Sequence, residues 1–477
     1  MYAYVDAAPP WLGEHIQKFI QRHEPDTTFV KSILDIPPDA TSVFQYCSGQ
    51  ELNRHFALLT RVPKGLMNAY PNSDAVARKD HLAAVIDFWS TKRPDSILPH
   101  HCPDTVRLTL DYAEYVDEAL MAADDLTLLA SLEDNADKPP SARDWWILKP
   151  ALVDCGAGIR LFSTIDELAS HLELAEYEHD SDTESDSDSD CGSDYQLSPS
   201  TSHDVATTSR AATPTPSSPT TSISTAATTP VSPLSVAAAA SRRPAKPTYT
   251  FVENGRIPSA QMRAFVAQRY LARPSTLDGR KWHCRAYVLA VGRLRVFVYR
   301  EMLALLAGEA YAPPWEGPSL KASLTNTALQ DEGDVERLRS MRDFWTGVDE
   351  FDEAWKEGVF GQICGVVSEV FKGAVNTMGD RFVAIDKCFE LFAVDFLVDE
   401  DGVAWLLEVN ETPAFYESPV TGPIAVRLME SVVEVAMGHM NGEEDSGKGV
   451  RGMVQVLDET ANLGKSNITE ILPEEAR

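Results

Sequence analysis

Residues 392–410 read Phe392-Ala-Val-Asp-Phe-Leu-Val-Asp-Glu-Asp-Gly-Val-Ala-Trp-Leu-Leu-Glu-Val-Asn410, and the rest of the chain is organised around them. Two apolar runs, rich in β-branched and aromatic residues, flank an acidic turn that ends at Gly402. This pattern predicts a β-hairpin. Because side chains alternate between the two faces of a strand, the hairpin is expected to bring the oxygen donors of Asp395, Glu408 and Asn410 onto one face.

The register of this hairpin decides whether the three donors converge. With Val398 paired to Val403, Asp395 lies opposite Leu406 and the donors share a face, whereas a turn one residue longer or shorter divides them. The alternative is that all three are solvated positions on an open face. Their neighbours are strongly apolar, which predicts burial, and a bound cation offsets the cost of burying carboxylates. Oxygen ligands without thiolate or imidazole suit Mg²⁺.

The size and charge of the chain limit its class. The chain has 477 residues, enough for two or three domains, and its apolar content of 44% is that of a soluble globular protein. Its formal net charge is −30 and its isoelectric point is about 4.7. This balance argues against nucleic acid as the main partner.

Cysteine spacing and the N-terminus predict a cytosolic protein. The seven cysteines are scattered and form no C-x-x-C pair, which favours free thiols over a disulfide frame or a zinc site. The N-terminal residues show no basic segment followed by a long apolar run, so no signal peptide is expected. The longest apolar candidate, residues 286–307, contains four charged side chains and is not expected to span a bilayer.

Composition divides the chain into segments. We expect a small N-terminal α/β domain over 1–73, a central lobe over 74–271, a C-terminal lobe over 272–441 and a flexible tail over 442–477. Within the central lobe, residues 178–247 are first acidic and then rich in Ser, Thr, Pro and Ala. With few apolar anchors, this insertion is predicted to be disordered.

Several cations lie at positions that suit a phosphate. A helix predicted over Asp74–Ser90 carries Lys79 near its start, where a cation is unfavourable unless an anion binds there. Lys149 ends an apolar strand and precedes a glycine-bearing loop, where backbone amides approach phosphate oxygens. The loop at 154–159 lacks the Gly-Lys-Ser/Thr of a Walker A motif. Ordinary solvated charges are the alternative.

A further set of cations is predicted on one face of a sheet. Lys281, His283 and Arg285 alternate along a predicted strand, and Arg300 is expected to join their face from the next strand. Opposite the acidic hairpin face, these cations would form an electrostatic cradle for a polyphosphate. A charged surface sheet is the alternative.

Six motifs, in this order, resemble the tubulin–tyrosine ligase family, which has the ATP-grasp fold. They are Trp146-Ile-Leu-Lys149 with its glycine-bearing loop, Gln268-Arg-Tyr-Leu271, Arg280-Lys-Trp-His-Cys-Arg285, Val298-Tyr-Arg300, Leu324-Thr-Asn326, and Asp395 with Glu408-Val-Asn410. The resemblance covers nearly the whole chain apart from the insertion and the tail. It implies an α/β (α+β) protein in which two mixed-sheet lobes clasp ATP, preceded by a small N-terminal α/β domain.

The resemblance also implies roles for individual residues. The implied Mg²⁺ ligands are Asp395, Glu408 and Asn410. The cations implied to hold the phosphates of ATP or an acyl phosphate are Lys79, Lys149, Lys281, Arg285 and Arg300. The run that is similar to the adenine-binding segment is Gln268, Arg269, Tyr270 and Leu271, and the pair near the nucleotide and the acceptor is Thr325 and Asn326. Catalysis is expected to involve Lys149, Arg285, Arg300, Asp395 and Glu408. His283 stands where the family commonly has Asp, a departure that bears on acceptor or amino-acid specificity.

The activity that the resemblance implies is ADP-forming carboxylate–amine ligation through an acyl phosphate. The first hypothesis is addition of tyrosine to the C-terminus of tubulin, with a protein acceptor and a free amino acid as partners, and with neither membrane nor direct nucleic-acid binding. A second hypothesis replaces tyrosine by glutamate or glycine and tubulin by another protein. A third is a nucleotide-binding scaffold of cytoplasmic mRNA processing bodies that has no ligase activity, since some fungal relatives are associated with those bodies.

Overall fold

The structure of the chain is a computed structural model. The residues that it describes are 1–7, 9–47, 49–110, 115–123, 125–152, 158–172, 264–325, 340–443, 446–447 and 449–461. The predicted insertion 178–247, residue Asn326 and most of the glycine-bearing loop after Lys149 lie outside the described residues.

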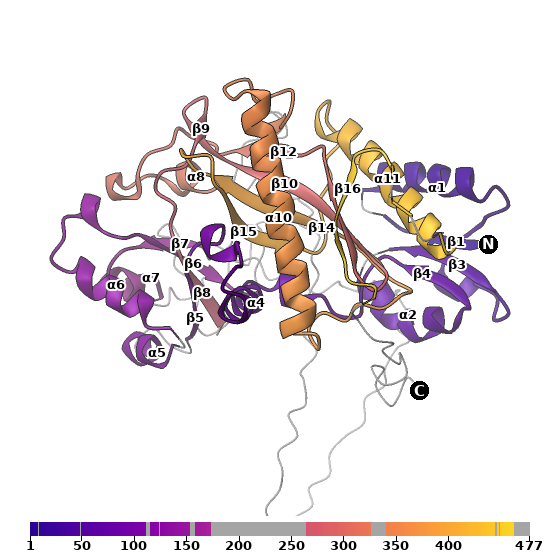
Figure 1. Ribbon diagram of the computed structural model, residues 1–477, viewed down its shortest axis with the longest axis horizontal. Coiled ribbons are helices and arrows are strands. Elements are labelled where there is room, and N and C mark those ends of the chain that lie inside the picture. The colour runs from indigo at the N-terminus through magenta and orange to yellow at the C-terminus, as the bar shows by residue number, and fades with distance from the viewer. Residues whose placement is uncertain are drawn as a thin grey trace, which may run out of the picture. The chain divides into compact units, whose positions relative to one another are not determined.

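The N-terminal part of the chain forms a parallel four-stranded sheet in the order β2-β1-β3-β4 (Figure 1). Its strands are β1 (Tyr2–Val5), β2 (Thr28–Val30), β3 (Ser42–Tyr46) and β4 (Lys64–Met67). Parallel neighbours need a crossover connection, which α1 (Pro10–His23) and α2 (Gly49–Arg61) supply. The predicted α/β unit at the N-terminus is therefore present.

A second four-stranded sheet carries one wall of the candidate site. Its order is β5-β8-β6-β7, and all neighbouring strands are antiparallel. The strands are β5 (Thr105–Thr109), β6 (Trp146–Pro150), β7 (Arg160–Phe162) and β8 (Ala264–Arg269). The helices in the same part of the chain are α5 (Val116–Ala122), α6 (Thr127–Asn135) and α7 (Ile165–Leu172).

The third sheet has eight strands and carries the opposite wall. Its central strand, β10, pairs antiparallel with β9, β11, β12 and β14; β14 also pairs with β15, β11 with β16 and β12 with β13. The strands are β9 (Thr276–Leu277), β10 (Arg280–Val291), β11 (Arg295–Tyr299), β12 (Leu303–Leu306), β13 (Met341–Asp343), β14 (Phe389–Val398), β15 (Ala404–Asn410) and β16 (Met453–Asp458).

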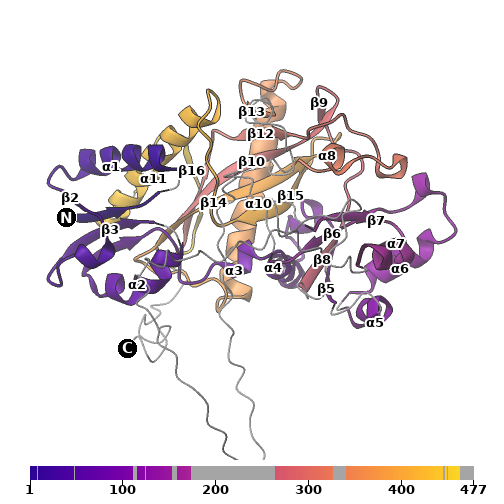
Figure 2. The same cartoon turned by 180° about the vertical axis from the view of Figure 1, so that it is seen from behind.

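Two long helices cover the two faces of this sheet. Even-numbered side chains of β10, such as Ala286 and Val288, pack in the same core cluster as α10 (Glu353–Thr377). Tyr287, Leu289 and Val291 point the other way and pack with α11 (Thr421–Met440), which also contacts α1. Figure 1 shows α10 lying across the sheet, and Figure 2 shows the strands β10, β14 and β15 from the opposite side. The odd-numbered residues nearer the Arg280 end of β10, Lys281 and His283, do not belong to this cluster and line a pocket instead.

The helix predicted over Asp74–Ser90 is two helices. The structure has α3 (Asp74–Ala77) and α4 (Lys79–Lys92), separated at Arg78, whose backbone is extended (φ −80°, ψ 128°). The Arg78 guanidinium donates two hydrogen bonds to Asp80, of 3.2 and 2.8 Å. The break makes Lys79 the first residue of α4, which the helical periodicity alone did not indicate.

The prediction of a flexible tail over 442–477 is partly wrong. Residues 453–458 form β16, which pairs antiparallel with β11, and the carbonyl of Val456 accepts a hydrogen bond of 2.8 Å from Ser368 of α10. Met453 and Leu457 are buried against the large sheet. A short polar-flanked strand becomes stable because its partner strand is already held in the core.

The remaining helices are short, and one long helix meets a membrane criterion. The short ones are α8 (Leu320–Ser323) and the 3₁₀ helices η1 (Ile33–Asp35), η2 (Leu98–His100), η4 (Pro140–Ala142) and η6 (Pro314–Glu316). Among the described residues, α10 is long and apolar enough to cross a bilayer, but half of its apolar window is buried in the structure, as in a core helix. The segment 286–307 that looked most apolar in the sequence forms strands.

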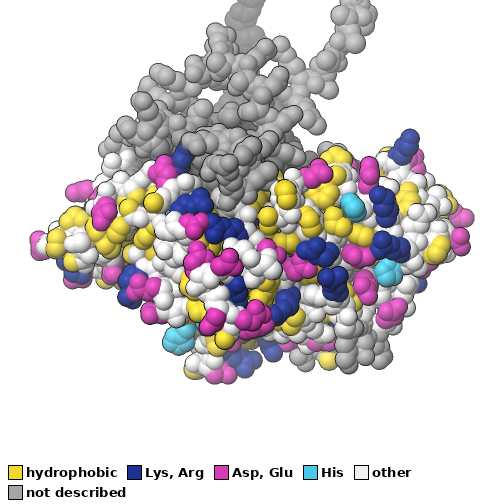
Figure 3. Space-filling view, turned by 90° about the horizontal axis from the view of Figure 1, so that it is seen from above, with side chains coloured by type: hydrophobic (Ala, Val, Ile, Leu, Met, Phe, Trp, Pro, Cys, Tyr) yellow, Lys and Arg dark blue, Asp and Glu magenta, His cyan; other side chains and the backbone are white. Residues whose placement is uncertain are grey.

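Surface charge is mixed on the face shown in Figure 3, where Lys and Arg side chains lie between Asp and Glu. The net charge of −30 is therefore not expressed as a continuous acidic surface on this face.

Candidate active site

The β14–β15 hairpin holds Asp395 directly opposite Glu408, in a register that differs from the prediction. Val398 pairs with Ala404 and not with Val403, so the turn is one residue longer than expected. A regular ladder would then place Leu407 opposite Asp395. A β-bulge between Asp395 and Phe396 shifts the pairing by one more residue and returns Glu408 to the Asp395 face. The predicted face is confirmed, although the predicted register is wrong.

Asp399 explains why the turn is longer. Its Oδ1 accepts hydrogen bonds from the backbone N–H groups of Asp401 and Val403, of 3.0 and 2.9 Å, and its Oδ2 accepts one of 2.8 Å from the indole N–H of Trp405. Gly402 adopts a positive φ of 79°, which the turn requires.

Arg285 forms a bidentate ion pair with Asp395. It is the Cα partner of Asp395 in the β10–β14 ladder, and its Nε and Nη2 donate hydrogen bonds of 2.9 and 2.8 Å to the two carboxylate oxygens. The Asn410 amide donates a weaker one of 3.3 Å to Oδ2. Burial alone raises the pKa of the Asp395 carboxyl, but the charge and hydrogen bonds of Arg285 outweigh it and hold that pKa below its ordinary value.

A pocket lies beside this pair and between the two sheets. It contains about 630 Å³ of empty space, part of it open to solvent, within the range typical of small-molecule sites. Its lining residues are Ile147, Lys149, Ile159, Gln268, Arg269, Tyr270, Leu271, Lys281, His283, Ser323, Leu324, Thr325, Asp395, Leu397, Leu407 and Glu408. Charged groups and aliphatic side chains thus face the same space.

Two buried lysines enter the pocket from different sheets. The Lys149 ammonium donates a hydrogen bond of 2.7 Å to the side-chain carbonyl of Gln268 on the neighbouring strand. The Lys281 ammonium lies 4.1 Å from the centroid of the Tyr270 ring. Burial lowers the pKa of Lys149 to about 8, and burial with repulsion from Lys149 lowers that of Lys281 to about 7. A bound anion would stabilise both positive charges.

Lys79 joins the site from the start of α4. Its ammonium lies 3.5 Å from Oε2 of Glu408, so in this structure Glu408 supplies a negative charge at the helix start. The same helix end lies close to the second sheet, since the Lys79 N–H donates to the carbonyl of Ala151, at 3.4 Å.

His283 lies between Lys281 and Arg285 on β10, and all three share a face, as predicted. Its Nδ1 lies 2.5 Å from the hydroxyl of Thr325, and its Nε2 lies 3.6 Å from Oδ1 of Asp395. Nε2 is buried and has no hydrogen-bond partner among the described residues. Burial lowers the pKa of the His283 imidazole, with a smaller opposing effect of Asp395.

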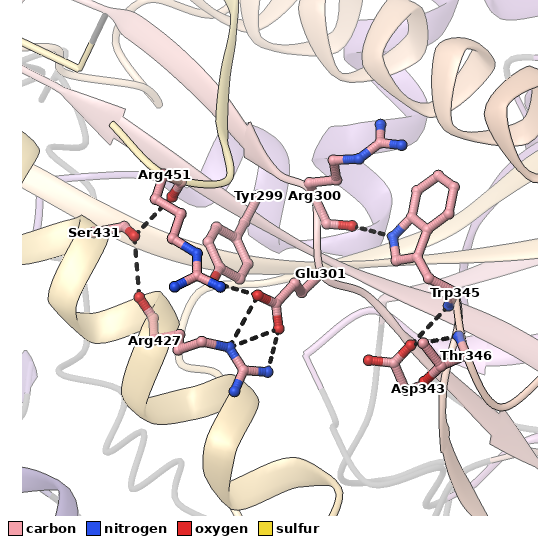
Figure 4. A network of polar contacts seen from close by, with 9 residues as sticks. All are labelled: Tyr299, Arg300, Glu301, Asp343, Trp345, Thr346, Arg427, Ser431 and Arg451. Atoms are coloured by element: carbon pink, nitrogen blue, oxygen red, sulfur yellow. Dashed lines mark hydrogen bonds and ion pairs between the residues drawn. The ribbon is translucent and has the colours of Figure 1, made fainter. Parts of the chain in front are cut away.

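The prediction that Arg300 joins the face of Lys281 and Arg285 is wrong. Continuing the β10–β11 register, Arg300 falls on the face of the even-numbered residues of β10, away from Lys281 and Arg285. Its guanidinium forms an ion pair with Glu357 of α10 and lies 4.1 Å from the centroid of the Trp345 ring. Figure 4 shows Arg300 and the next residue, Glu301, pointing in opposite directions, with Glu301 bound to Arg427 of α11. The error arose because the face of Arg300 was predicted without knowing the register between β10 and β11, which decides the face on which each side chain of β11 lies.

The predicted adenine segment lines the pocket at its strand end. Gln268 and Arg269 end β8, and Tyr270 and Leu271 follow it. The guanidinium of Arg269 is already engaged by two carboxylates, those of Asp104 and Asp144, at 3.0 and 2.9 Å. The charge of Arg269 is therefore already balanced by these two carboxylates, and Arg269 offers the pocket its backbone groups more than a free charge.

Three aliphatic residues of the pocket were not among the predicted site residues. Ile147, Leu397 and Leu407 line it together with the charged residues. The sequence could have predicted two of them, because residues two apart on a strand share a face. Ile147 lies two residues before Lys149, and Leu397 lies two residues after Asp395. Leu407 is the extra residue at the bulge, so alternation alone does not place it.

The donor set fits a hard divalent cation only in part. Among the described residues, no three His, Cys, Asp or Glu side chains are grouped closely enough to hold a metal ion by themselves. Asp395 and Glu408 face one another, Asn410 lies beside them, and the buried Nε2 of His283 lacks a partner. Magnesium commonly takes one or two carboxylates together with substrate phosphates, so these residues fit such an ion when a polyphosphate completes the site.

Comparison with known sequences places the chain in a family. The sequence model of the tubulin–tyrosine ligase family matches residues 59–444. A probable tubulin–tyrosine ligase of Schizosaccharomyces pombe is 34% identical over 398 residues, covering 83% of this chain and 82% of the relative. The probable tubulin–tyrosine ligase PBY1 of Saccharomyces cerevisiae is 28% identical over 387 residues, 79% of this chain. The match covers 43% of PBY1, so the chain spans less than half the length of that relative.

A solved structure with the same architecture is the C-terminal domain of Pby1 from K. lactis, described as an ATP-grasp enzyme that interacts with the mRNA decapping enzyme Dcp2. The two superpose with a TM-score of 0.60 at 23% identity, over 96% of this chain and 98% of that one. At this identity the likeness shows the fold. Together these matches show that the chain has the ATP-grasp fold and belongs to the tubulin–tyrosine ligase family.

Proposed function

We propose that this chain is an ATP- and Mg²⁺-dependent ligase that joins an amino acid to a protein carboxylate, with release of ADP and phosphate. The observation that carries the proposal is that two buried lysines, Lys149 and Lys281, line one pocket together with the carboxylates of Asp395 and Glu408. Within the described residues, neither ammonium forms an ion pair with a carboxylate. A polyphosphate would complement the lysines, and a divalent cation would complement the carboxylates.

Each group of residues has a part in this proposal. Lys149 and Lys281 would hold phosphate oxygens, while Arg285, fixed by Asp395, would keep that carboxylate ionised and correctly oriented. Asp395, Glu408 and Asn410 would hold Mg²⁺, which, when bound, neutralises charge on the phosphate oxygens. The aliphatic walls would contact the adenine ring and exclude water.

The proposed reaction requires positioning more than a protein nucleophile. The acceptor carboxylate attacks the γ-phosphorus, the bond to the ADP oxygen breaks, and an acyl phosphate forms. The amine of the amino acid then attacks the acyl carbon and phosphate leaves, while the amine loses a proton to solvent or to a nearby base. The pocket cations stabilise the negative charge on the transferred group.

Tyrosine and the tubulin C-terminus are the first candidates for donor and acceptor, because two relatives are named probable tubulin–tyrosine ligases. Glutamate is the second candidate donor. The tubulin polyglutamylase ttll-4 of Caenorhabditis elegans is 28% identical over 186 residues, 36% of this chain and 31% of that protein. A non-tubulin acceptor and glycine belong to the same second hypothesis.

A nucleotide-binding scaffold is the alternative function. The relative from K. lactis interacts with an mRNA decapping enzyme, which supports cytoplasmic mRNA processing bodies as a location and a decapping factor as a partner of this chain. His283 and the insertion 178–247 are consistent with such a role. The two functions differ in whether bound ATP is consumed.

A thermal-shift titration with ATP and Mg²⁺ tests the nucleotide binding that both proposals require. Wild type is expected to show an ATP-dependent rise in Tm, and Glu408→Gln a much smaller one. The matched control is Glu400→Gln in the exposed turn of the same hairpin, which should retain the wild-type shift. Absence of a shift in wild type would contradict nucleotide binding altogether.

Incorporation of labelled tyrosine, glutamate or glycine into detyrosinated tubulin then identifies the donor. Glu408→Gln should lower the rate by a factor of about a hundred or more, if the carboxylate contributes as charge-stabilising groups do in other active sites. ATP binding without incorporation of any of the three amino acids would exclude tubulin as acceptor and favour the scaffold.

A further inference from the structure

The Lys149 ammonium is held by a side chain that is itself held by a third residue. Lys149 is 6% exposed, and within the described part of the chain its ammonium makes a single hydrogen bond, of 2.7 Å, to Oε1 of Gln268. Nε2 of Gln268 donates a hydrogen bond of 3.1 Å to Oγ1 of Thr105. The Thr105 hydroxyl donates one of 2.8 Å to the backbone carbonyl of Pro103. We call this continuous chain of hydrogen bonds the Thr105 relay.

The chemistry of the two ends fixes the direction of the Thr105 relay. An ammonium only donates hydrogen bonds, so Lys149 requires the carbonyl oxygen of the Gln268 amide. A hydroxyl has a single proton, and in Thr105 the Pro103 carbonyl accepts it, so Thr105 offers Gln268 only lone pairs. One orientation of the amide therefore satisfies both neighbours. The flipped amide would point its N–H groups at the ammonium and its oxygen at a hydroxyl already bound to Pro103.

Thr105 is fixed between the two walls of the pocket. It begins β5 and is the Cα partner of Gln268 in the β5–β8 ladder. The residues just before it bind the other wall, since the carbonyl of His101 accepts a hydrogen bond of 2.8 Å from the N–H of Leu406 on β15. This segment thus links β15, which carries one of the hairpin carboxylates, to β8. The Thr105 relay extends the link to Lys149.

We propose that Thr105 is a positioning residue of the nucleotide site, which acts through Gln268 to hold the Lys149 ammonium where the phosphates of ATP bind. The inference rests on the proposed phosphate-binding role of Lys149. A lysine ammonium is a point charge on a flexible stem, so a side chain that is fixed beforehand loses less freedom when the ligand binds. The bond to Gln268 leaves the remaining N–H groups of the ammonium for phosphate oxygens.

The rival explanation is that the Thr105 relay only stabilises the local fold. Gln268 also belongs to the segment predicted to contact adenine, so a disturbed relay would then alter that end of the pocket. The two explanations differ in which part of the nucleotide is affected. Loss of a positioned ammonium weakens binding of the phosphates, whereas a distorted pocket weakens binding of adenosine as well.

The experiment measures the affinity of the full chain for a non-hydrolysable ATP analogue with Mg²⁺, by calorimetry, and for adenosine, by competition against that analogue. Thr105→Val keeps the shape of the side chain and removes the hydroxyl, so the Gln268 amide loses its acceptor. Affinity for the analogue should fall about threefold to tenfold, the effect of one hydrogen bond, while adenosine affinity changes less than about twofold. Thr105→Ser restores the hydroxyl and should return the affinity for the analogue to within about twofold of wild type.

Two further variants complete the test. Thr109→Val is the matched control, because Thr109 lies on the same strand, is exposed and does not line the pocket. It should leave both affinities unchanged. Gln268→Met interrupts the Thr105 relay next to the ammonium and should lower the affinity for the analogue at least as much as Thr105→Val. If Thr105→Val fails to fold, unchanged affinity in Gln268→Met would still overturn the relay.

The outcomes separate this inference from the proposed function. If wild type binds the ATP analogue no more tightly than adenosine, the lysines do not bind phosphate and both proposals fail. If wild type prefers the analogue and Thr105→Val keeps that preference, only the role of Thr105 is overturned. An equal loss of both affinities in Thr105→Val would overturn it as well, since the effect would then come from the shape of the pocket.

Discussion

Asp395→Asn should destabilise the large sheet, because it leaves the Arg285 guanidinium without its paired carboxylate. The Asp395 side chain is 4% exposed and that of Arg285 is 18% exposed. Removing one partner of a buried ion pair typically costs about 3–5 kcal/mol, since the remaining charge is uncompensated. Glu408 also interacts with Arg285, and the guanidinium is partly accessible, so we expect the lower end, about 3 kcal/mol.

Hydrogen exchange followed by mass spectrometry measures this loss where it occurs. A loss of about 3 kcal/mol lowers the protection of β10 and β14 amides by a factor of about a hundred, when those amides exchange through opening of the sheet. Asp401→Asn, in the exposed turn of the same hairpin, is the control and should leave protection unchanged.

A double substitution tests the cause. Arg285→Met added to Asp395→Asn removes the uncompensated charge, so the double variant should be more protected than Asp395→Asn alone. The reasoning is refuted if Asp395→Asn loses less than about tenfold in protection, or if the two substitutions are simply additive.

Three further predictions concern Lys281, Gly402 and Arg300. Without nucleotide, the free energy of unfolding measured in urea should rise between pH 7 and pH 9. The folded-state pKa of Lys281 is about 7, below the ordinary value near 10.4, so the unfolded chain binds more protons over this range. Lys281→Met should reduce the rise by up to about 1.4 kcal/mol per pH unit. Gly402→Ala should lower the stability measured in a thermal melt by about 1–2 kcal/mol, because φ is 79° and a Cβ would lie 3.0 Å from the Trp355 indole nitrogen. The control is Gly361→Ala in α10, where a Cβ meets no atom within 4 Å, and it should be neutral or stabilising. Arg300→Ala should change the affinity for an ATP analogue, measured by calorimetry, by no more than about twofold, because the guanidinium packs on Trp345 and not in the pocket. It should lower the free energy of unfolding by about 1 kcal/mol or less. A tenfold loss of affinity would restore the predicted role of Arg300.

Several features of the site were predictable from local sequence. The alternation of Lys281, His283 and Arg285 along one strand follows from the backbone geometry of any extended chain, so their common face needed no tertiary information. The same holds for Glu408 and Asn410.

Other features depend on contacts between distant segments. The hydrogen bonds of Asp399 lengthen the hairpin turn, and only the bulge beside Asp395 returns Glu408 to the correct face. Arg300 falls on the α10 side because the register between β10 and β11, and not its own alternation, sets its face. Residues 453–458 form a strand because β11 offers an edge to them.

Sequence by itself therefore determined which side chains of this protein share a strand face and which chemical groups each strand carries. The tertiary structure decided which faces meet, and so which lysines and carboxylates surround one pocket and which histidine nitrogen lacks a partner. The physical reason is that alternation is a property of one backbone segment. Register, burial and charge pairing are properties of two segments held together by the whole core.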